Sequence, residues 1–502
     1  MKQLTGLDAT FLSMETPNQF GHVSSVSIYE RPDDPDFSPY EAWKAAIAKR
    51  LHLLEPLRRR LVEVPLSIDH PFWVEDPAFD LDYHVRHTAL PPPGGREQMS
   101  KLVARLIGRP LDRTRPLWES YVVEGLSDNR FAVFTKVHHA TVDGASGAEL
   151  LTLMLDQTPE GDDIPPPTEE WRPERVPSDF EVLNRAAANL VRKPGRLLLL
   201  SARAAREVGK ATRNPVLVAA ANQYRSTLRG PLGTVLNIGR SRDEERDPPP
   251  PLPNLRAPRT PFNHSITAHR NFSYDSTSLD AVKAIKNAMG ATVNDVVMGA
   301  CAGGLRAYLD EKGLLPDEPL VAMVPVSIRT GLETEKWTNR VSGLLATIPT
   351  DEPDLGERVR KVHEAMNAGK DMFQAIPADM LTDFAQFPSP AIFARAARMA
   401  TRFRLGDRFN PPINLVISNV PGPRTPLYST GAKLQHYYPV STIVDGQGLN
   451  ITVQSYLDTL DWGLVACREL VPDLDHLLDL IVREMELMAK AVEVDVPVRL
   501  AG

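Results

Sequence analysis

The sequence predicts an α/β protein built from two halves joined by a long connector, and three observations support this prediction. Residues 1–155 alternate strand-like and helix-like patterns, and residues 263–502 alternate in the same way. Residues 156–262 differ in composition and carry proline runs near both ends. The chain has 502 residues, which is too long for one ordinary hydrophobic core. We therefore expect an N-terminal domain, a connector and a C-terminal domain with these bounds.

The overall composition is that of a globular protein, since 42% of residues are hydrophobic and 24% are charged. The net charge of −7 argues against nucleic acid as the main partner. Cys301 and Cys467 lie far apart and form no metal-type spacing, so we expect no bound metal and a reducing compartment.

The start of the chain and its hydropathy predict a cytoplasmic location. Residues 1–8 lack the apolar core of a signal peptide. No stretch reaches the roughly 18 uninterrupted apolar residues of a membrane-spanning helix. We expect a chain without such a helix that can still contact a membrane surface.

The apolar periodicity of the first half alternates between the periods of strands and helices. It predicts, in chain order, a strand over 23–29, helices over 40–51 and 99–107, strands over 118–123 and 131–137, and a helix over 147–155.

The connector combines extended and helical sequence with an unusual charge. Residues 165–167 and 248–251 are proline runs, which resist helix and sheet. Residues 185–229 hold ten basic residues against one acid, Glu207, giving +9 in a chain of net −7. This segment suits an anionic bilayer surface, and it equally suits a crossover helix with a solvated basic face. Residues 390–408 form a second, weaker candidate for a basic amphipathic helix.

The second half again combines helical and strand-like periods. Thr292 and Asp295 have the types and spacing of helix-capping residues. The patterns predict helices over 278–289, 292–309 and 473–492 and strands over 320–328, 344–348, 414–418 and 449–456.

One short motif carries most of the functional information. Residues 138–144 read His-His-Ala-Thr-Val-Asp-Gly, and four fixed types at this spacing arise by chance in about one per thousand chains of this length. The motif follows a predicted strand, and a histidine at a strand end next to glycine suits a general base. The sequence contains no serine-nucleophile elbow, phosphate loop or zinc-protease helix. An acyl-transfer site is therefore the chemistry that the motif favours.

Strand alternation separates the two histidines of the motif. Successive side chains point to opposite faces, so His139 shares a face with Val137 and His138 faces away. Only one ring can face a given cavity, and we predict that His139 is the catalytic one. Asp143 either orients that ring or holds the turn. A lone histidine would more often be a core residue, but the doubled histidine with the spaced Asp-Gly favours catalysis.

The motif and its context resemble the bacterial wax ester synthase/diacylglycerol acyltransferase family. The motif alone also occurs in chloramphenicol acetyltransferases and peptide-synthetase condensation domains, but the combination is specific and spans nearly the whole chain. The further matches are Pro116-Leu117-Trp118-Glu119, Leu7-Asp8-Ala9-Thr10-Phe11 with Glu15, Thr292-Val293-Asn294-Asp295-Val296, Val324-Pro325-Val326-Ser327 and Ser418-Asn419-Val420-Pro421-Gly422-Pro423.

The resemblance implies two chloramphenicol-acetyltransferase-like halves joined by a crossover, with an active-site tunnel between them. Acyl-CoA would be the co-substrate, without a resident cofactor, and diacylglycerol or a long-chain alcohol the acceptor. By motif position His139 is the general base and His138 and Asp143 are supports. Gly144 and Asn294 are candidates for support or for stabilising the oxyanion, although Asn294 and Asp295 could simply cap a helix.

The resemblance also implies a place for the reaction, since the family makes triacylglycerol and wax esters at membranes and lipid inclusions. We expect a peripheral location on the inner face of the membrane or on inclusions. The sequence leaves acyl-chain length, substrate-binding residues and oligomeric state open. Two other interpretations are a non-catalytic scaffold of lipid inclusions and an acyltransferase whose donor is bound to a carrier protein.

Overall fold

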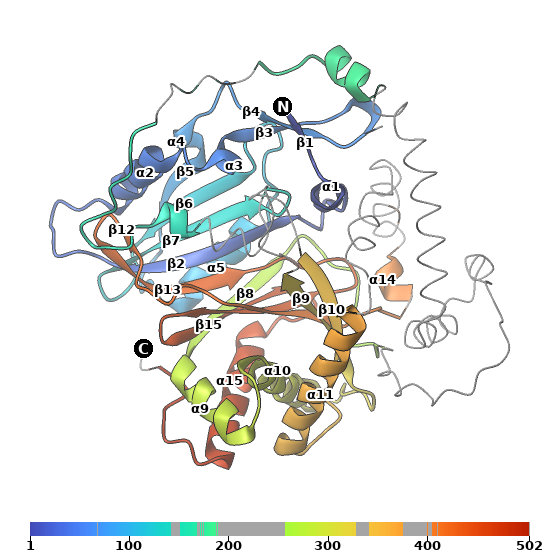
Figure 1. Cartoon of the computed structure of the whole chain (residues 1–502). Helices are drawn as coiled ribbons and strands as arrows, with labels where there is room; N and C mark the ends of the chain where they lie inside the picture. The colour runs from blue at the N-terminus through green and yellow to red at the C-terminus, as the bar shows by residue number, and fades with distance from the viewer. Residues whose placement is uncertain are drawn as a thin grey trace.

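The computed structural model describes residues 1–67, 69–141, 151–167, 171, 173, 175–186, 188, 257–327, 341–374, 399, 404–408 and 410–500. Within them lie two six-stranded sheets, one above the other in Figure 1, with helices at the outer faces. The long helices gather below the lower sheet.

The first sheet has the strand order β12-β13-β2-β7-β6-β5 and holds the strand that ends in the histidine motif. Its strands are β2 (His22–Glu30), β5 (Val85–Ala89), β6 (Trp118–Glu124), β7 (Arg130–His138), β12 (Tyr428–Ser429) and β13 (Ala432–Val440). Beside it, β1 (Lys2–Gln3), β4 (Phe72–Glu75) and β3 (Arg59–Val62) form a small sheet in that order. The helices of this half are α1 (Gly6–Ser13), α2 (Pro39–Arg50), α3 (Glu55–Arg58), the 3₁₀ turn Pro65–Ser67, α4 (Leu81–His84) and α5 (Arg96–Ile107).

The second sheet has the order β10-β9-β11-β14-β15-β8. Its strands are β8 (Arg270–Ser278), β9 (Leu320–Ser327), β10 (Val341–Ile348), β11 (Leu415–Val420), β14 (Leu449–Tyr456) and β15 (Thr459–Cys467). The helices are α9 (Leu279–Met289), α10 (Val293–Glu311), α11 (Leu355–Gln374), α14 (Leu405–Arg408) and α15 (Leu474–Ala491). Every residue of β15 is buried, which is typical of a strand covered on both faces.

Most predicted elements are confirmed within one to three residues. The predicted strands over 23–29, 118–123 and 131–137 are β2, β6 and β7, and the helices over 278–289 and 473–492 are α9 and α15. The sequence patterns missed the longer elements β8, β13, β15 and α11, and they also missed the shorter elements β1, β3, β4, β5, β12, α1, α3 and α4. β8 is rich in serine and threonine, and β13 mixes polar and aromatic residues, so neither has a clear apolar alternation.

Successive side chains of β7 point to opposite faces of the sheet, as predicted, because alternate residues belong to different hydrophobic clusters. Phe131, Val133 and Val137 belong to one hydrophobic cluster, together with residues of α2. Ala132 and Phe134 belong to another cluster, together with residues of α5 and β8. The periodicity that separated the two histidines therefore holds along the whole strand.

One strand from the second half of the chain belongs to the sheet of the first half, which the sequence did not predict. β13 comes from the second half of the chain but pairs with β2 in the first sheet. It also lies against β15 of the second sheet, where a Cβ atom on Gly463 would come within 1.7 Å of the Pro439 carbonyl oxygen. Only glycine permits this approach. The domain bounds at residues 155 and 262 stay a prediction. β12 and β13 lie after these bounds in the chain but belong to the first sheet.

Several predictions fall on residues outside the described ranges. These are the first four residues of the helix over 147–155, whose described residues 151–154 are helical as predicted, nearly all of the basic segment 185–229 and most of 390–408. Among the residues that the structure does describe, none of the helices has the length and apolar content needed to cross a membrane.

Candidate active site

The histidine motif forms a tight turn at the end of β7. The His138 N–H donates to the Leu117 carbonyl at 2.9 Å, and the His139 N–H donates to the Gly21 carbonyl at 2.8 Å. The Thr141 N–H then donates back to the His138 carbonyl at 2.8 Å, which closes the turn. The backbone on both sides of the two rings is therefore fixed by neighbouring chain segments.

His138 is a structural residue of this turn. Its side chain is 1% exposed, and its Nε2 lies 3.2 Å from the Glu15 Oε1 atom. Its Nδ1 accepts the Ala140 N–H at 3.0 Å, so the proton must be on Nε2 and is donated to Glu15. A Cβ atom on Gly21 would come within 2.7 Å of Nε2, so the ring also needs glycine beside it. Both nitrogens are occupied, and the ring has no lone pair left to accept a proton from substrate.

Glu15 is held as a carboxylate by the groups around it. Burial alone would raise its pKa, but the hydrogen bond from His138, the Gly21 N–H and the Arg113 guanidinium together lower the pKa to about 2. Arg113 binds Oε2 at 2.8 Å and also donates to the Leu12 carbonyl at 2.6 Å. The carboxylate therefore joins α1, the motif turn and Arg113 into one network.

His139 differs from its neighbour in exposure and in contacts. Its side chain is partly exposed, whereas that of His138 is sealed. Its ring lies parallel to the Phe11 ring, with 4.0 Å between centroids and 11° between planes. Phe11 belongs to α1, so the same helix region orients both histidines through different residues. A partly exposed imidazole on an aromatic platform has the access and fixed orientation that a general base requires.

The other predicted site residues have three different outcomes. Asp143 and Gly144 lie outside the described residues, so their roles stay predictions. Asp295 caps α10, because its carboxylate accepts the Thr292 N–H at 2.9 Å and also binds His363 Nδ1 at 2.7 Å. Asn294 is partly buried in the first turn of α10, which packs among α9, α11 and α15. Its oxyanion role stays a prediction.

Phe11, Glu15, Gly21 and Arg113 support the site although sequence reasoning assigned them no role. Phe11 and Glu15 were noted only as part of a family match. Gly21 and Arg113 belong to no motif and are recognised only through their contacts with the two histidines and Glu15. The only available signal was the spacing from Leu7 to Glu15, which does not reveal the partners.

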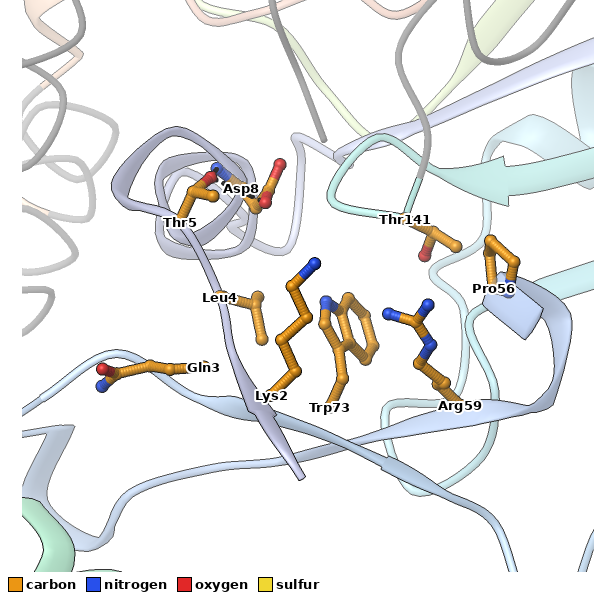
Figure 2. A pocket seen from close by; sticks show the side chains of 9 residues that line it. All are labelled: Lys2, Gln3, Leu4, Thr5, Asp8, Pro56, Arg59, Trp73 and Thr141. Carbon is orange, nitrogen blue, oxygen red and sulfur yellow. Dashed lines mark hydrogen bonds between the residues drawn. The ribbon is translucent and has the colours of Figure 1, made fainter. Parts of the chain in front are cut away.

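A small pocket adjoins the turn at Thr141. In Figure 2 the Lys2 ammonium group and the Arg59 guanidinium group lie on either side of the Trp73 indole. Asp8 and Thr141 lie above these three side chains in the view. The Thr141 hydroxyl is buried and has no hydrogen-bond partner among the described residues. The pocket volume is about 20 Å³, enough for roughly one water molecule and too small for an acyl chain. We therefore do not assign substrate to it.

Comparison with family models identifies both halves of the chain. Residues 4–297 match the wax ester synthase/diacylglycerol acyltransferase catalytic domain, and residues 337–489 match the C-terminal domain of the same family. A putative diacylglycerol O-acyltransferase of Mycobacterium tuberculosis is 35% identical over 94% of this chain and 87% of its own length. The O-acyltransferase WSD of Acinetobacter baylyi is 32% identical over 97% of each chain.

Solved structures agree with this relation. The wax ester synthase/diacylglycerol acyltransferase from Marinobacter aquaeolei VT8 aligns with a TM-score of 0.67 and 30% identity, over 98% of this chain and 100% of that one. The first condensation domain of the CDA synthetase aligns with a TM-score of 0.53 at 16% identity, which shows a common fold. These matches confirm the predicted α/β class of two acetyltransferase-like halves. The chain belongs to the wax ester synthase/diacylglycerol acyltransferase family.

Proposed function

We propose that this chain is an O-acyltransferase that moves a long-chain acyl group from acyl-CoA to diacylglycerol and to long-chain alcohols, forming triacylglycerol and wax esters. The observation that carries the proposal is the contrast between the two motif histidines. One is locked by Glu15 and Ala140, and the other is partly exposed on the Phe11 ring. The names of relatives that match almost the whole chain support the same reaction.

In the proposed reaction His139 accepts the hydroxyl proton of the acceptor as its oxygen attacks the thioester carbonyl carbon. The carbon–sulfur bond breaks, and the imidazolium returns the proton to the departing thiolate to give free CoA and the ester. The thioester already carries a good leaving group, so neither a covalent acyl-enzyme nor a resident cofactor is needed. General-base assistance of this kind contributes about 10² to 10⁴ in rate.

The supporting residues have separate proposed roles. His138 and Asp143 hold the turn, and Gly144 allows close approach of the substrate to the backbone. Asn294 donates a hydrogen bond to the oxyanion, a contribution of about 2.7–4 kcal/mol in other enzymes. The tunnel between the halves would exclude water and so protect the thioester from hydrolysis.

The direct test incubates the purified protein with palmitoyl-CoA and either dipalmitoylglycerol or hexadecanol, following thiol release and ester formation. The wild type should form both esters, and His139→Ala should lose ester formation while keeping the wild-type circular dichroism spectrum. Near-normal activity of His139→Ala would refute the role of this ring. Thiol release without ester would identify a hydrolase, and neither product would favour the non-catalytic scaffold.

Asn294 needs a test of its own because it lies in the first turn of α10, where Thr292 and Asp295 make the capping hydrogen bonds. Asn294→Ala should lower kcat by about 10² or more if it stabilises the oxyanion, with little change in melting temperature. Unchanged kinetics in Asn294→Ala would refute the oxyanion role.

We further propose that the chain works peripherally on the inner membrane face or on lipid inclusions. Support comes from the +9 charge of residues 185–229 in the sequence and from the water-insoluble acceptors. Vesicle flotation tests this proposal. The chain should float with vesicles that contain anionic lipid and detach as salt is raised, whereas failure to float with any vesicle would refute it.

A further inference from the structure

A large groove lies where the two halves meet. Its volume is about 900 Å³, and its walls are α5 from the first half and the chain around the starts of β8 and α15 from the second. α5 lies between the two sheets and packs against β8, the edge strand of the second sheet (Figure 1). The groove is thus formed by both halves and is far larger than the pocket at Thr141.

The groove is strongly basic although the chain as a whole is acidic. Two acids, Glu97 and Asp475, line it, against the five basic residues Lys101, Arg105, Arg109, Arg270 and Arg468. The lining charge is therefore +3, in a chain of net charge −7. Lys101 pairs with Glu97. Arg105 and Arg109 are exposed and form no ion pair within the described part of the chain. Such a surface attracts an anion of high charge.

One hydroxyl in the groove wall is buried without a partner. Ser100 is 8% exposed, and its Oγ atom makes no hydrogen bond among the described residues. Leaving a buried polar group unsatisfied costs free energy, so native structures normally pair such groups. A polar ligand in the groove would supply the missing partner.

The groove also contacts residues 15–21, the loop whose Glu15 and Gly21 bind the two motif histidines. Arg270, which is 4% exposed, donates to the Asn18 carbonyl at 2.6 Å and lies over the Phe20 ring. The same loop, residues 15–21, supplies the Glu15 carboxylate to His138 and the Gly21 carbonyl to His139. Burial lowers the pKa of Arg270 to about 10, which leaves it charged at neutral pH. A ligand in the groove therefore lies one loop away from the proposed general base.

We propose that this groove binds the phosphorylated nucleotide end of the acyl-CoA donor, with Arg105 and Arg109 contacting its phosphates. The inference rests on the proposed acyl transfer and adds the location of the donor. The negative charges of the 3′-phosphate and the diphosphate would balance the positive charge of the groove. Exposed arginines bind phosphate oxygens in bidentate geometry. The flexible pantetheine arm would carry the thioester past residues 15–21 to His139.

Binding of the nucleotide alone tests the groove without requiring catalysis. Titration calorimetry of 3′-phosphoadenosine 5′-diphosphate into the full chain should show about tenfold weaker binding for Arg105→Ala/Arg109→Ala than for wild type. The matched control is Lys283→Ala/Lys286→Ala on α9, which removes two positive charges away from the groove and should stay within about twofold of wild type. Equal loss in both double variants, or in neither, would overturn the proposal.

Kinetics gives an independent readout. The preference for palmitoyl-CoA over palmitoyl-pantetheine, measured as a ratio of kcat/KM values, should fall about tenfold in Arg105→Ala/Arg109→Ala and recover in part in Arg105→Lys/Arg109→Lys. An unchanged ratio would overturn the location of the donor. Charge-dependent nucleotide binding by a chain that makes no ester would instead refute the proposed function and leave the groove assignment standing.

Discussion

At the scale of single residues, the two histidines show how partners divide the roles of identical side chains. Burial and two hydrogen bonds give His138 a fixed tautomer and a structural task. His139, one position along the chain, keeps partial exposure and stacks on Phe11. The difference arises from α1 and from the loop that follows it, which contact each ring differently.

The first prediction concerns Glu15, the carboxylate that holds His138. Glu15→Ala should destabilise the fold by about 3 kcal/mol and lower the acyl-transfer rate, because it leaves Arg113, His138 and the Gly21 N–H without their shared partner. Urea unfolding and the thiol-release assay measure the two effects. The matched control is Glu63→Ala, which removes the exposed second carboxylate of Arg113 and should cost less than about 0.5 kcal/mol. Similar losses in the two variants would contradict the assignment.

The second prediction is the pH dependence that follows from the same carboxylate. The pKa of Glu15 falls from its ordinary value of 4.5 to about 2 on folding, so the ionised group stabilises the folded state above pH 5. That contribution, about 3 kcal/mol, is lost as the pH falls from about 5 to 2. The stability difference between wild type and Glu15→Gln should therefore shrink over this range when unfolding is followed in urea at each pH. A difference independent of pH would show that Glu15 is not ionised in this network.

At the scale of elements, close helix packing depends on small residues that helix propensity alone would disfavour. Gly303 and Gly304 lie in the interior of α10, where glycine costs about 1 kcal/mol relative to alanine. A Cβ atom on Gly304 would come within 2.5 Å of the Ile481 side chain and 2.8 Å of its backbone. Glycine is therefore the residue that lets α15 approach α10 at this crossing.

The third prediction compares the same substitution in two helices. Gly304→Ala should destabilise the protein by about 1–3 kcal/mol, because α15 must move away. Gly356→Ala in the first turn of α11 meets only ordinary contacts and should be neutral or stabilising by up to about 1 kcal/mol. Thermal unfolding of both variants distinguishes packing from propensity, and equal effects would show that packing does not control Gly304.

At the scale of the whole molecule, β13 joins the two sheets into one unit. It hydrogen-bonds to β2 in the first sheet and packs on β15 of the second. The same region of contact continues through α5 and β8, where the basic groove lies. The relative position of the halves therefore determines both the groove and its distance from the motif turn.

The fourth prediction tests this junction. Gly463→Ala places a methyl group against the Pro439 carbonyl oxygen and should force β13 and β15 apart, at a cost of about 1–3 kcal/mol. The affinity of the groove for the nucleotide should also fall, because the separation of β13 and β15 shifts the two halves relative to each other. Calorimetric unfolding and nucleotide titration measure the two effects. A stability equal to that of the Gly356→Ala control would refute the close contact.

By itself, the sequence determined the fold class and about half of the strands and helices, and it predicted that the two motif histidines face opposite sides of their strand. These follow from periodicity, since the spacing of apolar residues along a segment reports which of its faces is buried. Tertiary structure alone decided the partners: Glu15 for His138 across 123 positions, β13 in the first sheet, and a basic groove assembled from α5 and β8. The physical reason is that a local pattern specifies a buried face but not the distant surface that covers it, and that choice is made by packing of the whole chain.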